Sequence, residues 1–112
     1  MDAIEPEKTF VQGILQISVG CYHLRNGNAK GSMILLGEGI KRLKDYQPDF
    51  ESIDVTTLVS SSAQFLSSIQ TLESDAIASV ATWLQTHSQG NEPWTSPMGT
   101  LLKRPDLRLV SV

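Results

Sequence analysis

The feature that most constrains this chain is an uncharged, largely apolar segment near its N-terminus. No Asp, Glu, Lys or Arg lies between Phe10 and Leu24. We predict a helix from Pro6 to Arg25, because proline suits a first helical position and the Asn26-Gly27 pair suits the left-handed backbone at a helix end. Such a helix is apolar over most of its circumference, which is typical of burial on several sides. Its main stripe is Phe10, Ile14, Ile17, Cys21 and Leu24, widened by Val11, Leu15 and Tyr22.

The opposite side of this helix carries a candidate polar site, His23, Gln16 and Gln12, together with Val19. One hypothesis is a histidine that is hydrogen-bonded within a helix interface, since an unpaired buried polar group costs about 1–3 kcal/mol. The other is one wall of a polar or metal site. A single histidine cannot hold zinc, which usually needs three protein ligands, and no spacing brings His87 to His23. Cys21 lies two residues from His23, roughly 200° around the helix, and we interpret it as a small apolar residue.

Three further helices are expected. The second runs from Ala29 to about Tyr46 after the N-cap Asn28, and it forms an antiparallel pair with the first. The segment QPDFESID is then a loop that ends in the N-cap Asp54. A third helix runs from Val55 to about Leu72. A fourth ends near His87, and the sequence leaves open whether a break at Ser74-Asp75 separates it from the third.

After Ser88 the character of the sequence changes, because prolines and glycines punctuate the remainder. We divide the chain into a helical domain at 1–88 and an irregular C-terminal tail at 89–112. In the tail, Trp94 and the Leu101-Leu102 pair are expected to dock on the helices, and LRLVSV suits a short strand with no obvious partner. The predicted fold is all-α, a small bundle of three or four helices with an irregular C-terminal arm. The glycines of the first two helices suit close helix packing.

Composition excludes several classes of function. The formal net charge of −3 argues against nucleic acid as a partner, and the single cysteine excludes an internal disulfide. The N-terminus is unlike a signal peptide, and the apolar runs are far shorter than the ~20 residues of a membrane helix. We therefore expect a cytoplasmic protein with no membrane partner. The sequence has no GxSxG, no phosphate-binding loop and no CxxC, so no catalytic residue is assigned.

Five segments occur in order along the chain: QGILQ from Gln12, YHL-x-x-GN from Tyr22, Lys30-Gly31, LLGEG-x-x-RL from Leu35, and Y-x-P-x-x-x-x-ID from Tyr46. Through these segments the chain from Ile4 to Leu72 resembles a known family, domain of unknown function 309, and LLGEGIKRLKDYQPD resembles its cyanobacterial branch. The family comprises small all-helical proteins labelled as predicted metal-dependent hydrolases.

The resemblance also implies an element that this sequence does not contain. In typical members a helix with the motif H-x-x-L-E-x-x-W precedes the segment that matches Ile4 to Leu24. Of the family's proposed polar site, only His23 and, more weakly, Gln16 have counterparts here. Loss of one neighbour would expose part of the first helix, including the polar stripe. An upstream segment, the residues from Ile77 onward folded back, or a second copy of the chain could cover it, and we favour the first.

These observations support two main hypotheses of function. The first is a non-enzymatic module that binds a protein partner or itself as a homo-oligomer. The alternative is the metal-dependent hydrolase implied by the resemblance, in which a divalent metal activates water with His23 and ligands from outside this chain. A small-ligand carrier with the polar stripe as its pocket is a third hypothesis. Otherwise no cofactor is predicted.

Overall fold

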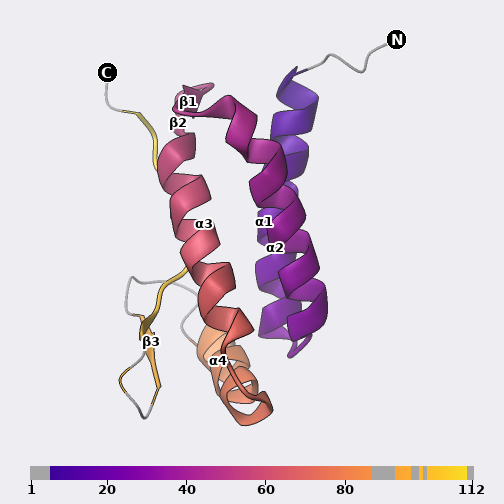
Figure 1. The fold of residues 1–112 in the computed structure, drawn as a ribbon, viewed down its shortest axis with the longest axis vertical. Coiled ribbons are helices and arrows are strands. Elements are labelled where there is room, and N and C mark those ends of the chain that lie inside the picture. Colours follow the sequence, from indigo (N-terminus) through magenta and orange to yellow (C-terminus); the bar gives the residue numbers. More distant parts are fainter. Residues whose placement is uncertain (1–5, 87–92, 97–98, 100, 111–112) are drawn as a thin grey trace.

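The computed structural model describes residues 6–86, 93–96, 99 and 101–110. Over these ranges it is a small all-α bundle of four α-helices, as predicted (Figure 1). The helices are α1 (Pro6–Arg25), α2 (Ala29–Leu43), α3 (Val55–Gln70) and α4 (Ser74–Thr86), and a 3-10 turn, η1 (Lys44–Tyr46), extends α2. The helix α1 packs against α2 and α4, while α3 packs against α2.

The turn between α1 and α2 has the geometry that its sequence predicts. Gly27 takes a φ of 81°, a left-handed conformation that costs glycine nothing. The Asn28 side chain then caps α2, because its Oδ1 accepts a hydrogen bond of 2.9 Å from the backbone N–H of Gly31. The two helices consequently run antiparallel, side by side (Figure 1).

Glycines allow the backbones of α1 and α2 to approach closely. A Cβ atom at Gly39 would lie 2.8 Å from the carbonyl oxygen of Gly13 and 2.9 Å from Cδ1 of Ile17. A Cβ at Gly20 would lie 2.9 Å from Cγ of Leu36. Neither position has room for a side chain, so the interface depends on glycine at both.

The predicted loop before α3 contains a tight β-hairpin. Strand β1 (Asp49–Phe50) pairs with the antiparallel strand β2 (Ile53–Asp54). The two turn residues, Glu51 and Ser52, have φ angles of 51° and 66°. This left-handed pair is the geometry of a two-residue hairpin, but the Glu-Ser sequence lacks the usual Asn-Gly signal.

The hairpin positions two structural features. Asp54 caps α3, because its carboxylate accepts hydrogen bonds from the Thr57 backbone N–H at 3.0 Å and from the Thr57 hydroxyl at 2.7 Å. Phe50 packs against the rings of Phe10 and Tyr46, with centroids 4.8 and 4.9 Å away. The N-terminal end of α1 is thereby anchored to the segment between α2 and α3.

The helices α3 and α4 are separate, which answers the question left open by the sequence. The helix α3 ends at Gln70 and α4 begins at Ser74. Their buried residues, including Phe65, Ile69, Val80 and Leu84, join those of α1 and α2 in one apolar core.

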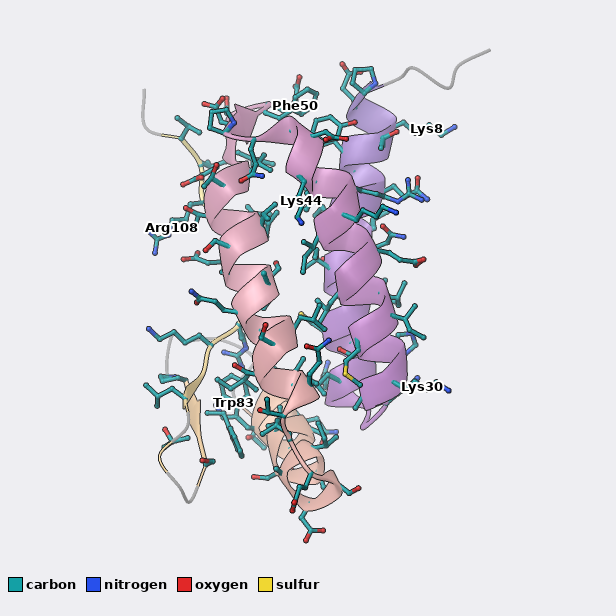
Figure 2. The ribbon with its side chains drawn as sticks, viewed as in Figure 1. Lys8, Lys30, Lys44, Phe50, Trp83 and Arg108 are labelled. Carbon is teal, nitrogen blue, oxygen red and sulfur yellow. The ribbon has the colours of Figure 1, made fainter. Side chains whose placement is uncertain are left out.

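The C-terminal segment makes more ordered contacts than an irregular arm would. Strand β3 (Trp94–Thr95) pairs with the antiparallel strand β4 (Leu101–Leu102), and Trp94 and Leu102 are buried while Leu101 is exposed. Figure 2 shows Trp83 beside this segment, and the Arg104 guanidinium lies 4.3 Å from the centre of its ring. The predicted boundary at 88/89 lies outside the described residues.

The expectation that LRLVSV has no strand to pair with is wrong. Leu109 forms an isolated antiparallel bridge with Ile53. The backbone N–H of Asp54 donates to the carbonyl of Arg108, and that of Val110 donates to the carbonyl of Ser52, both at 2.8 Å. The pairing was missed because its partner is the β1–β2 hairpin, which the sequence did not reveal.

Candidate functional site

The predicted polar residues lie along one side of α1, in three different environments. Gln12 is exposed, whereas Gln16 and His23 are half-buried. The Gln16 side-chain oxygen accepts a hydrogen bond of 3.0 Å from Nε of Arg42 on α2. His23 places Nδ1 3.5 Å from the side-chain nitrogen of Asn28, the residue that caps α2. These two contacts link α1 to α2 and to its cap, and they lead to different partners, Arg42 and Asn28.

The described residues do not fit a catalytic metal centre. Within 6–86, 93–96, 99 and 101–110, no three His, Cys, Asp or Glu side chains lie close enough together to hold a metal ion. A zinc site usually needs three such ligands, and His23 is the one candidate that the sequence offered. His87, the other histidine, lies outside the described residues. The metal-dependent hydrolase therefore stays a prediction from the resemblance.

Cys21 lies in an apolar environment that suppresses its reactivity. Burial raises the pKa of its thiol from 9.0 to about 11, although the positive charge of Arg104 acts in the opposite direction. Because the thiolate is the reactive form, Cys21 is a poor nucleophile at neutral pH. It lines a groove between α1, α3 and the C-terminal segment with Ile14, Ile17, Ser18, Leu58, Arg104, Pro105 and Leu107.

The most distinctive surface is an apolar stripe on the side of α1 that faces solvent, formed by Val11, Leu15, Val19 and Tyr22. We call these four residues the outer stripe. Their side chains are exposed to 52%, 56%, 40% and 58%, respectively. The opposite side of α1 is buried through Gly13, Ile17, Gly20 and Leu24.

The outer stripe corrects one expectation from the sequence. Val11, Leu15 and Tyr22 were predicted to widen the buried stripe, but all three side chains are exposed. The helix α4 does pack against α1, and the Gln85 side chain donates a hydrogen bond of 2.8 Å to the carbonyl of Arg25. That contact lies at the C-terminal end of α1 and leaves the outer stripe uncovered.

Comparison with known proteins bears on the same helices. Residues 1–35, which include α1 and the first part of α2, match the family model described as "Domain of unknown function (DUF309)". The match covers about a third of the chain, and over these residues the chain is similar to the DUF309 family. It agrees with the part of the resemblance from Ile4 to Leu72 that lies within residues 1–35. No curated protein and no solved structure matches the chain.

Proposed function

We propose that this protein is a helical binding module and that the outer stripe of α1 is its docking surface for another polypeptide. The observation that carries the proposal is the exposure of four apolar side chains, each at least 40% accessible, on one side of one helix. Single exposed apolar residues are normal on protein surfaces, but contiguous groups usually mark an interaction site.

The arrangement of α1 suits a helix-in-groove or helix-on-helix contact. Its buried side is held against α2 by close glycine packing, so the exposed side belongs to a rigid element. Gln12, exposed beside the stripe, offers an amide that can donate and accept hydrogen bonds at the rim of a contact. An apolar centre with a polar edge is the usual anatomy of a protein–protein interface.

Membrane association is not the basis of the proposal. Within the part of the chain that the structure describes, no helix is long and apolar enough to cross a bilayer. The outer stripe is also narrow, because the polar residues Gln12 and Gln16 lie beside it on α1. A narrow stripe of this kind matches the contact width of a single partner helix.

Site-specific photo-crosslinking in the cell of origin tests the proposal. A photoreactive amino acid replaces Val19 in the outer stripe, and in a matched control it replaces Ile34, which is 55% exposed on α2. We expect a discrete crosslinked product from position 19 and none from position 34. Equal products from both positions, or none from position 19, would refute the docking surface. Mass spectrometry of the product identifies the partner as a second copy or as a different protein.

A further inference from the structure

Three residues of the outer stripe, together with the exposed Ser18, have the spacing of a helix-pairing seam. Val11, Leu15, Ser18 and Tyr22 follow one another at intervals of four, three and four residues, the alternation typical of two packed helices. The seam spans roughly 17 Å, at about 1.5 Å per residue. When two such seams run antiparallel, Val11 of one faces Tyr22 of the other, and Leu15 faces Ser18. Each larger side chain then meets a smaller one, which favours close packing.

Charges at the two ends of α1 favour the same arrangement. Glu7 in the first turn and Arg25 in the last turn are eighteen residues apart, which is five turns of an α-helix, so they lie on the same side. Both are exposed, and neither has an ion-pair partner among the described residues. Along the sequence, the midpoint between Glu7 and Arg25 is Gln16, which nearly coincides with the midpoint between Val11 and Tyr22. One two-fold axis therefore brings Glu7 of each copy to Arg25 of the other.

We infer that the partner of the outer stripe is a second copy of this chain, paired antiparallel through α1. The two-fold axis of this pair crosses the outer stripe at the level of residue 16 along α1. This inference rests on the proposed function. It favours a second copy over the upstream segment preferred from the sequence alone, because Glu7 and Arg25 at the two ends of α1 complement each other in an antiparallel pair. A parallel pair would place Glu7 against Glu7 and Arg25 against Arg25, which is unfavourable at both ends. A two-fold pair is also closed, because each copy presents the same surface to the other.

The expected dimer is weak. The seam is short, so its interface lies at the low end of the sizes found for specific complexes. Figure 2 shows Lys8 projecting away from the bundle at the same end as Glu7, and its charge reduces the attraction for Arg25. Exposed ion pairs contribute little individually, but the symmetry doubles each of them. We therefore expect a monomer–dimer equilibrium with a micromolar dissociation constant.

Sedimentation equilibrium of the purified full chain, over a roughly hundredfold concentration range, tests the inference. We expect a monomer–dimer equilibrium that Leu15→Lys abolishes, whereas Ile34→Lys, at an equally exposed position on α2, leaves it unchanged. Circular dichroism confirms that both variants remain helical. A monomer at all concentrations, or a dimer that Ile34→Lys disrupts as strongly as Leu15→Lys, would overturn the inference.

Charge reversal tests the antiparallel orientation. Glu7→Arg and Arg25→Glu each turn two attractions into repulsions, so each should weaken the dimer roughly tenfold. The double variant restores both attractions and should return the dissociation constant to within about threefold of the original. An equimolar mixture of the two single variants should also form dimers. No effect from either single variant, or no recovery in the double variant, would overturn the antiparallel pairing.

Two experimental outcomes distinguish a wrong partner from a wrong docking surface. A crosslink from position 19 to a different protein, combined with a monomeric purified chain, refutes self-pairing and leaves the docking surface intact. The absence of any crosslink from position 19 refutes the docking surface itself.

Discussion

Gly39 and Gly37 provide a matched test of the close packing between α1 and α2. Both lie within α2, two residues apart, and alanine favours a helix over glycine by about 1 kcal/mol. A Cβ at Gly37 meets nothing within 4 Å, whereas a Cβ at Gly39 would lie 2.8 Å from the carbonyl oxygen of Gly13. That oxygen belongs to the backbone of α1, so it can move only if the two helices separate.

The expected changes in the free energy of unfolding follow from these contacts. Gly37→Ala should stabilise the fold by about 1 kcal/mol through helix propensity alone. Gly39→Ala gains the same propensity but adds an overpacking cost of about 1–3 kcal/mol, so its net effect is a loss of up to about 2 kcal/mol. The two variants should therefore differ by about 1–3 kcal/mol in their free energy of unfolding.

Urea denaturation followed by circular dichroism measures this difference, and thermal unfolding checks it. At about 4 °C per kcal/mol for a domain of this size, the unfolding midpoints should differ by about 4–12 °C. An unchanged slope with urea would show that both variants unfold from equally compact states. Stabilisation of the same size by Gly39→Ala and Gly37→Ala would refute the close approach of α1 and α2.

Two further predictions concern the C-terminal segment and the cap of α3. Leu102→Ala should lower the free energy of unfolding, measured by urea denaturation, by about 2 kcal/mol or more because Leu102 is fully buried. Leu101→Ala, at a position that is 53% exposed, should change it by less than about 0.5 kcal/mol. Equal effects of the two variants would show that β4 does not dock on the helices. Hydrogen bonds from the Thr57 side chain and backbone lower the pKa of Asp54 below 3.8. The contribution of the Asp54 carboxylate to stability is therefore fully present above pH 3.8, and it is lost as the pH falls through the lowered pKa. Asp54→Ala should therefore lower the thermal midpoint at pH 7 and have progressively less effect below pH 3.8, and a pH-independent difference would contradict this explanation.

Local signals in the sequence predicted most of the helical structure. The start of α1 at Pro6, its end at Arg25 and the caps Asn28 and Asp54 are confirmed because each depends on side chains within a few residues of the helix end. The β1–β2 hairpin was missed because Glu51 and Ser52 have no turn signature. Its pairing with Leu109 also joins segments more than fifty residues apart, which no local pattern indicates.

The sequence predicted only part of the candidate site. The helical spacing of Gln12, Gln16 and His23 predicted that they share one side of α1, but their hydrogen-bond partners could not be derived. Arg42 reaches Gln16 only because α2 folds back beside α1. The groove around Cys21 likewise depends on Arg104 and its neighbours in the C-terminal segment.

The sequence by itself determined that α1 is a helix, that it has no charge between Phe10 and Leu24, and that glycines allow a neighbour to approach it closely. Tertiary structure alone decided which part of α1 is covered. Helical periodicity places apolar residues around an axis, but burial depends on how many other helices pack there. In this fold α2, α4 and the core cover one side, and Val11, Leu15, Val19 and Tyr22 remain exposed. The exposure of the outer stripe therefore follows from the number and placement of the neighbours of α1, which its own residues do not encode.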